Sequence, residues 1–331
     1  MKPPRVRIQR RPVHGVLLLD KPIGLSSNDA LQKAKWLLRA EKAGHTGTLD
    51  PLASGLLPLC FGAATKFSQV SLDADKRYTA TLRLGQTTAT GDAEGEVLRE
   101  RPVVVSRERL DQVLAGFLGP ISQVPPMHSA LKHEGKALYE YARAGVTIER
   151  DARQVTIHAL QVLHVEGAQV VLDVVCSKGT YVRTLAEDIG EALGCGAHLS
   201  ALRRTGSGPL DVAQAVTLEA LTAMDEPSRV AGLLPPDALL RDWPAVHLPA
   251  DEAGKFLSGM RRRVKLADAA QVRVYGPSQD DRTVKDPPDA PVQVLLGSAH
   301  VQAGELIADR LLSPPEVAAL MHQQPLQAQP A

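Results

Sequence analysis

The stretch that most constrains the fold runs from Gly44 to Gly55, reads GHTGTLDPLASG and lies between apolar runs. Its three glycines permit positive φ angles and let a ligand approach the backbone closely. Pro51 restricts the residue before it to extended conformations, which predicts a stiff loop that holds the side chain of Asp50 at one angle. An aspartate in such a loop can also cap a turn, so this stretch alone leaves a structural role for Asp50 open.

Regular elements are predicted on both sides of this loop. Residues 15–20 form a short apolar run typical of a buried strand, and Ser26 with Asp29 marks the start of a helix. Residues 76–85 alternate between two faces, which predicts a strand with Tyr78 on its apolar face, in the core or in a site. Further along, the sequence predicts a helix over 106–118, two antiparallel strands over 155–165 and 169–176, and a helix that ends at Gly194.

Tyr181 and Arg183 lie where the second of these strands meets the following helix. Residues at such junctions can project into a cleft, although a tyrosine also suits the core and an arginine the surface. Residues 124–153 carry basic side chains with interleaved tyrosines, which suits either a segment that grips nucleic acid or an ordinary surface helix. The basic stretches 1–11 and 259–263 have the same two interpretations, contact with RNA or a solvated run of charge.

The composition is that of an ordinary globular chain, with 331 residues of which 44% are hydrophobic and 23% charged. No apolar run of about 18 residues and no secretory signal is present, so neither a membrane span nor secretion is expected. Cys60, Cys176 and Cys195 lack paired or metal-ligand spacing, which predicts buried thiols in a reducing cytosol. Residues 1–210 hold 27 Lys and Arg against 21 Asp and Glu, whereas 211–331 hold 11 against 16, so the first part could face a polyanion.

The candidate chemistry depends on Asp50, because the sequence contains no P-loop, dinucleotide fingerprint, metal cluster or Ser-His-Asp order. A carboxylate in such a loop can act as a nucleophile or stabilise a cationic sugar, as in glycoside chemistry. An arginine beside it would keep it ionised, and a tyrosine ring could stack on a base. This chemistry requires neither a metal nor a cofactor, and none is expected.

Three blocks of the sequence resemble the TruB family of tRNA pseudouridine synthases. They are GHTGTLDPLASG from Gly44, CSKGTYVR from Cys176 and GCGAHLSALRR from Gly194. The block KPIGLSS from Lys21 is similar to a structural motif beside the family's active site, which makes Lys21 a supporting residue at most. The resemblance covers residues 13–210 strongly and the remainder loosely.

This resemblance implies an α/β (α+β) fold, with a pseudouridine synthase catalytic domain built on a central mixed, mainly antiparallel sheet. A small β-rich, PUA-like C-terminal domain follows. The predicted segments are a flexible basic arm over 1–12, the catalytic domain over 13–245 with an RNA-gripping insertion at 124–153, the PUA-like domain over 246–314 and a tail over 315–331.

The resemblance also implies an activity, the isomerisation of uridine 55 in the TΨC loop of tRNA to pseudouridine by base flipping. The enzyme would act in the cytoplasm as a monomer on the tRNA T-arm, without a guide RNA, protein partner, cofactor or metal. Matching positions assign catalysis to Asp50 as nucleophile, Tyr78 and Arg183. They assign substrate binding to His45, Tyr78, Tyr181 and Leu202, and RNA binding to Lys132, Lys136, Arg143 and Arg203.

Two other functions are compatible with parts of this pattern. A non-catalytic RNA-binding or tRNA-folding protein on the same scaffold would share the affinity for RNA but would not need Asp50. An enzyme that hydrolyses free nucleosides would use the carboxylate, but it would not need the basic insertion at 124–153.

Overall fold

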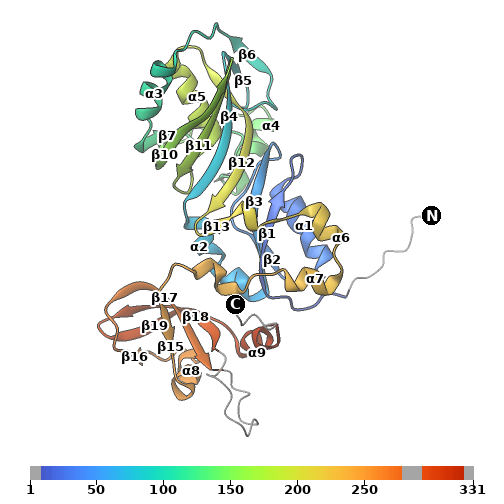
Figure 1. Cartoon of the computed structure of the whole chain (residues 1–331), viewed down its shortest axis with the longest axis vertical. Coiled ribbons are helices and arrows are strands. Elements are labelled where there is room, and N and C mark those ends of the chain that lie inside the picture. The colour runs from blue at the N-terminus through green and yellow to red at the C-terminus, as the bar shows by residue number, and fades with distance from the viewer. Residues whose placement is uncertain (1–8, 278–292, 324–331) are drawn as a thin grey trace, which may run out of the picture.

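The computed structural model describes residues 9–277 and 293–323, and two β-sheets organise it (Figure 1). The larger sheet contains β1 (Gly15–Lys21), β2 (Ala43–His45), β3 (Ala53–Phe61), β4 (Lys76–Leu84), β7 (Gly119–Gln123), β10 (Arg153–Glu166), β11 (Gln169–Cys176), β12 (Ala197–Ser207), β13 (Leu210–Asp211) and β14 (Val216–Thr217). Its order is β14-β1-β3-β12-β4-β11-β10-β7, with β2 added to β3 and β13 to β12. The β1–β14 and β3–β12 pairs are parallel and the other pairs are antiparallel.

Helices pack on this sheet at both ends. They are α1 (Ser27–Leu37), α2 (Ser68–Asp73), α3 (Arg107–Ala115), α5 (Val182–Leu193), α6 (Leu218–Ala223) and α7 (Glu226–Ala231). As predicted, the Ser26 hydroxyl caps α1 by accepting from the Asp29 amide, and Gly194 ends α5 with a φ of 85°. Figure 1 shows α3 and α5 together beside β7, β10 and β11, while α1, α6 and α7 lie beside β1 and β2.

Two smaller features extend from the large sheet. One is the hairpin of β5 (Gln86–Thr88) and β6 (Val97–Glu100), and the other is the insertion, with β8 (Lys132–His133), β9 (Lys136–Ala137) and α4 (Leu138–Arg143). The hairpin follows β4, and its turn brings Thr90 and Asp92 to Arg183 at the start of α5. The insertion follows β7, whose Gln123 bonds to the backbone of Tyr181 just before α5. This placement brings loops from distant parts of the sequence to one edge of the sheet.

The second sheet belongs to the C-terminal part of the chain. It contains β15 (Ala245–His247), β16 (Arg262–Arg263), β17 (Ala269–Pro277), β18 (Gln293–Gln302) and β19 (Glu305–Leu311), in the order β15-β17-β18-β19-β16. The helices α8 (Ala250–Leu257) and α9 (Pro314–Gln323) accompany it. Its apolar residues share a continuous buried cluster with Val16, Leu56 and Phe67 of the large sheet's layer, so apolar packing joins the two parts of the chain.

The predicted tail over 315–331 is wrong for its first nine residues, because α9 continues to Gln323. A proline pair at the first turn begins this helix, Val317 and Leu320 are buried, and Glu316 forms an ion pair with Lys66 near β3. Residues 324–331 lie outside the described residues.

The predicted flexible arm over 1–12 is also wrong where the structure describes it. Arg11 bonds through its amide to the Arg39 carbonyl, and its side chain pairs with Glu226. Residues 1–8 lie outside the described residues. The polar run 259–263 is folded as well, because Arg261 pairs with Glu305 and Arg262 with Glu252.

The α+β fold, with its mixed and mainly antiparallel sheet and its β-rich C-terminal part, is confirmed. All three cysteines are buried, free thiols, which agrees with the sequence. Among the described residues, no helix is both long and apolar enough to cross a bilayer.

Candidate active site

The loop that carries Asp50 is held by hydrogen bonds to the segment after β1. The Ser27 hydroxyl, 2% exposed, accepts from the Leu49 amide at 2.7 Å and lies 3.1 Å from the Leu49 carbonyl. The Gly24 amide donates to the Pro51 carbonyl at 2.8 Å, and the Ala53 amide donates to the Asp50 carbonyl at 3.0 Å. The backbone on both sides of Asp50 is therefore fixed, as the proline and glycines predict.

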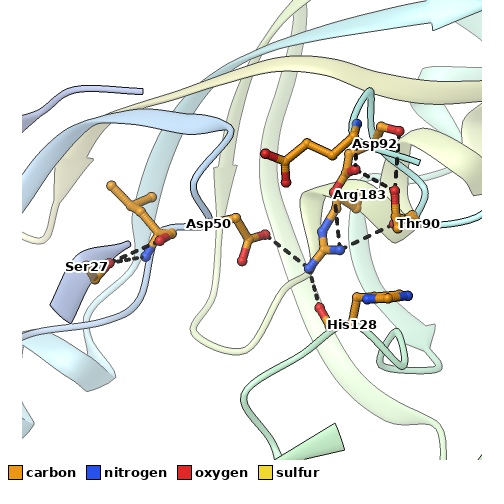
Figure 2. A network of polar contacts seen from close by, with 8 residues as sticks. Ser27, Asp50, Thr90, Asp92, His128 and Arg183 are labelled. Carbon is orange, nitrogen blue, oxygen red and sulfur yellow. Dashed lines mark hydrogen bonds and ion pairs between the residues drawn. The ribbon is translucent and has the colours of Figure 1, made fainter. Parts of the chain in front are cut away.

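Arg183 meets Asp50 from the opposite side, as Figure 2 shows. The guanidinium is 6% exposed and lies at the first turn of α5, with Nη2 3.0 Å from the Asp50 carboxylate. The same Nη2 donates to the His128 carbonyl of the insertion at 2.6 Å, and Nη1 donates to the Thr90 carbonyl at 3.3 Å. Arg183 is thus a buried cation that connects three loops, and the surface position considered for it is wrong.

Asp92 is a second carboxylate in this network, and sequence reasoning did not single it out. It is 3% exposed and lies 3.3 Å from Nη1 of Arg183. Its carboxylate accepts from the Thr90 hydroxyl at 2.5 Å and from the Glu94 amide at 3.1 Å. The GDAEG tract that contains it was the available signal, since an aspartate between glycines in a polar loop suits a fixed carboxylate.

Asp50 combines accessibility with partial desolvation. Its side chain is 44% exposed, so a substrate can reach it. Desolvation by the surrounding protein raises the pKa of Asp50. The guanidinium of Arg183 opposes this rise and is the largest effect that lowers the pKa. Lys21 is fully buried, donates to the Pro22 and Leu25 carbonyls and further favours ionised Asp50, and burial lowers the pKa of Lys21 to about 8.

Tyr78 and Leu202 lie on the two strands that flank the middle of the sheet. Tyr78 is on β4 and Leu202 on β12, and each packs against two of the buried clusters, one on either side. Both side chains are half-buried, and burial raises the pKa of the Tyr78 hydroxyl. An uncharged ring and an aliphatic side chain can therefore form part of an apolar wall.

Tyr181 precedes α5 and is positioned through its backbone by Gln123, a residue that sequence reasoning missed. Gln123 is 2% exposed, accepts from the Tyr181 amide at 3.1 Å and donates to the Tyr181 carbonyl at 3.3 Å. Burial raises the pKa of the Tyr181 hydroxyl, so the phenol is neutral at pH 7. Nothing in the sequence around Gln123 distinguishes this residue from an ordinary polar residue at the end of a strand.

His45 ends β2, five residues before Asp50. Its Nδ1 is buried and has no hydrogen-bond partner within the described ranges. Burial lowers the pKa of His45, and the nearby Arg204 lowers it further, so the imidazole is neutral at pH 7. A buried polar atom without a partner is costly and would gain from a bound polar ligand.

The four predicted RNA-binding residues do not form one group. Lys132, Lys136 and Arg143 are exposed on the insertion, with Arg143 placed 5.3 Å above the Tyr139 ring. Arg203, in contrast, lies on β12 and forms a two-pronged ion pair with Asp20 at 2.7 and 3.0 Å. Its charge is therefore compensated within the protein.

The arrangement can hold an ionised, accessible carboxylate beside an apolar wall and two neutral tyrosines. It offers a nucleophile and π surfaces rather than a set of metal ligands, and in the described part of the chain no group of three His, Cys, Asp or Glu could hold a metal ion.

Relatives match nearly the whole chain, and family models match residues 35–241. Residues 35–182 match the model described as "TruB family pseudouridylate synthase (N terminal domain)", and residues 183–241 match "tRNA pseudouridylate synthase B C-terminal domain". A protein of Verminephrobacter eiseniae named tRNA pseudouridine synthase B is 58% identical over 97% of this chain and 95% of its own length. One of Ralstonia pickettii with the same name is 61% identical over 94% of this chain and 96% of its own.

Solved structures share the fold. One, described as a Cbf5-Nop10-Gar1 complex, contains a chain 26% identical to this one, with a TM-score of 0.67 over 94% of this chain and 87% of that one. Another, described as an H/ACA RNP bound to a substrate RNA containing 2′-deoxyuridine, is 25% identical with a TM-score of 0.65 over 93% and 86%.

Proposed function

This chain belongs to the TruB family of pseudouridine synthases, and on that basis we propose that it converts uridine 55 in the TΨC loop of tRNA to pseudouridine. The relatives are named for tRNA, which supports tRNA as the substrate class. The proposed enzyme acts in the cytoplasm as a monomer, on the T-arm, without a guide RNA or a cofactor.

The observation that carries this proposal is the ion pair between Asp50 and Arg183. The carboxylate is held on one side through Leu49 and Ser27 and on the other by a guanidinium 3.0 Å away, yet 44% of it remains exposed. A protein that only bound RNA would not benefit from an accessible carboxylate, because phosphates would be repelled by it. The position and charge of Asp50 suit a nucleophile that acts on a neutral nucleoside.

Pseudouridine formation exchanges one bond of the ribose for another. The bond from C1′ to N1 breaks and its electrons remain with the uracil, after which the base turns and C5 bonds to C1′. The proton on C5 then leaves and N1, which gave up the ribose, takes a proton, so the product has the same atoms as the substrate. In the proposed roles, Asp50 is the nucleophile: it bonds to the nucleoside as the C1′–N1 bond breaks and is released again before the product forms. Tyr78 receives the C5 proton while its hydroxyl passes its own proton on to N1, so the phenol is neutral before and after the step.

Two other residues would hold the detached base, and a third would support the flipped conformation of the RNA. Tyr181 stacks on the uracil, an interaction worth roughly 1–3 kcal/mol per base. Leu202 supplies the apolar wall, and His45 fills the space in the RNA that the flipped uridine leaves. Flipping costs a few kcal/mol, and these contacts offset that cost.

Arg183 is proposed to keep Asp50 ionised, and Asp92 to keep Arg183 in place. Because Asp92 is nearly inaccessible, it cannot reach a substrate, but its ion pair at 3.3 Å fixes the orientation of the guanidinium. These roles follow from the contacts, because the cation Arg183 lies between the accessible carboxylate of Asp50 and the buried carboxylate of Asp92.

The proposed RNA contacts extend beyond this site. Lys132, Lys136 and Arg143 on the exposed surface of the insertion suit phosphate contacts. Arg203 would contribute only if its ion pair with Asp20 opened. Residues 13–245 form the proposed catalytic domain, and the β-rich part over 246–314 is proposed to be a PUA-like RNA-binding domain.

The experiment that tests the proposal measures pseudouridine at each position of an unmodified tRNA transcript. The wild type is compared with Asp50→Asn, which preserves shape and removes charge, and with Asp111→Asn, an exposed aspartate on α3 that serves as the matched control. We expect modification at position 55 with the wild type and the control, and none with Asp50→Asn at equal RNA affinity. RNA binding without product from any of the three would instead support a non-catalytic RNA-binding protein.

A further inference from the structure

Arg204 is a buried cation for which the proposed reaction has so far given no role. It lies on β12, between β3 and β4, and is 1% exposed. Among the residues that the structure describes, no Asp or Glu forms an ion pair with it. An uncompensated guanidinium in the middle of a sheet is costly, which makes its remaining contacts informative.

The Arg204 side chain reaches both ends of the loop that carries Asp50. Its Nε donates to the Leu56 carbonyl at 2.6 Å, and its Nη2 makes a longer contact of 3.5 Å with the Gly47 carbonyl. Gly47 precedes Asp50 and Leu56 follows it, so one rigid planar group spans the loop at its base. A guanidinium suits this task because its donors have a fixed geometry.

The backbone of Arg204 also approaches this loop closely. Arg204 pairs with Gly55 across the parallel β3–β12 contact, and Gly55 has a φ of +100°. A Cβ at position 55 would lie 2.2 Å from the Arg204 carbonyl oxygen, so this approach requires glycine. Side chain and backbone of one residue therefore fix the end of the loop where it enters β3.

On its other side, Arg204 faces Tyr78. The two residues are direct partners in the antiparallel β4–β12 pair. The guanidinium lowers the pKa of the Tyr78 hydroxyl, although burial raises it by more. Arg204 thus lies between the Asp50 loop and the tyrosine proposed to receive the C5 proton, and its charge favours negative charge on that tyrosine.

We propose that Arg204 is a positioning residue for the reaction, which ties the two ends of the Asp50 loop and holds Tyr78 in register with it. This inference rests on the proposed function, because it assigns a reaction to Asp50 and Tyr78. It differs from a purely structural role in one respect: the effect of Arg204 on the rate passes through Tyr78.

The test is a double-mutant cycle in single-turnover kinetics on unmodified tRNA. The variants are Arg204→Met, Arg204→Lys, Tyr78→Phe and Arg204→Met/Tyr78→Phe. Arg77→Met is the matched control, because Arg77 precedes Tyr78 on β4 but is exposed and paired with Asp173. For each protein the rate constant at saturating RNA, the Kd for RNA and the midpoint of thermal unfolding are measured.

We expect Arg204→Met to lower the rate constant by about 100-fold, the order of loss that a 1 Å misplacement of a catalytic group produces. The Kd for RNA should stay within about threefold of the wild type. Arg204→Lys should recover part of the rate, because a lysine can still donate to these carbonyls, and Arg77→Met should match the wild type. The double variant should be no slower than the slower single variant, because the effect of Arg204 passes through Tyr78 and is already lost in Tyr78→Phe.

Multiplicative effects in the double variant, or a loss of rate fully explained by weaker RNA binding, would overturn the proposal. If Arg204→Met does not fold, the cycle is run with Arg204→Lys instead. Wild-type activity of Arg204→Lys would then overturn the proposal. An inactive wild-type protein would refute the proposed function itself, which separates the two failures.

Discussion

Replacing Arg183 by methionine perturbs both stability and chemistry, because the guanidinium serves two carboxylates of different burial. Asp50 is 3.0 Å from it and 44% exposed, whereas Asp92 is 3.3 Å from it and 3% exposed. Once Arg183 is removed, water can solvate the charge of Asp50 but cannot reach the buried charge of Asp92. We therefore expect the loss of stability to come from Asp92 and the change in pH dependence to come from Asp50.

The loss of stability and the strength of the Asp50–Arg183 attraction can both be estimated from these contacts. Breaking a buried ion pair costs about 3–5 kcal/mol, and Asp92 keeps hydrogen bonds from Thr90 and Glu94, so we expect about 3 kcal/mol. For Asp50, unit charges 3.0 Å apart attract by about 5 kcal/mol at an effective dielectric constant of 20. Solvent screening of a side chain 44% exposed reduces this to about 1 kcal/mol.

The sign of the pH effect follows from the direction of the shift. Burial already raises the pKa of Asp50, and Arg183 opposes that rise, so removing Arg183 raises the pKa further. Because the ionised carboxylate is the reactive form, activity falls as pH decreases through this pKa. The acid limb of kcat/KM should therefore move to higher pH in Arg183→Met.

Thermal unfolding and a pH–rate profile measure the two effects separately. Arg183→Met should unfold about 6 °C below the wild type, and Arg183→Met/Asp92→Asn should recover most of that loss without recovering activity. Equal stability of the single variant and the wild type would refute the reasoning about Asp92. An acid limb that stays in place would refute the reasoning about Asp50.

Three further predictions concern the loop that carries Asp50. Ser27→Ala removes both hydrogen bonds to Leu49, and we expect a loss of about 1–3 kcal/mol with slower turnover, measured by denaturant unfolding and single-turnover kinetics. Gly55→Ala forces a Cβ to within 2.2 Å of the Arg204 carbonyl at a φ of +100°, so the variant should express poorly or melt well below the wild type. In a pH–rate profile of the wild type, the acid limb of kcat/KM should lie above the ordinary pKa of an aspartate, because burial raises the pKa of Asp50.

Local sequence signals predicted the elements whose determinants lie within a few residues. The Ser26 cap, the alternation in β4, the β10–β11 hairpin and the Gly194 stop each depend on neighbours along the chain, and each is present. The proline after Asp50 likewise predicted a fixed loop. The pairing of Asp50 with Arg183 could be expected only through the family resemblance, because 133 positions separate them.

Residues whose roles depend on distant contacts were not predicted. Asp92 and Gln123 are ordinary polar residues in sequence, and only the fold brings them to Arg183 and to the backbone of Tyr181. Helix α9 was missed because its ten residues begin with a proline pair, and Val317 and Leu320 gain their burial from contacts distant in sequence. Arg203 was assigned to RNA because its charge was visible in sequence, whereas its partner Asp20 was not.

The most direct test of the central claim is the release of tritium from tRNA labelled at C5 of its uridines, because isomerisation replaces that hydrogen by carbon. With wild-type protein, the account predicts release equivalent to a single uridine per tRNA, no release from a transcript with cytidine at position 55, and none with Asp50→Asn. Release that persists in Asp50→Asn, or from the cytidine transcript, would contradict the assignment of the carboxylate or of the target position.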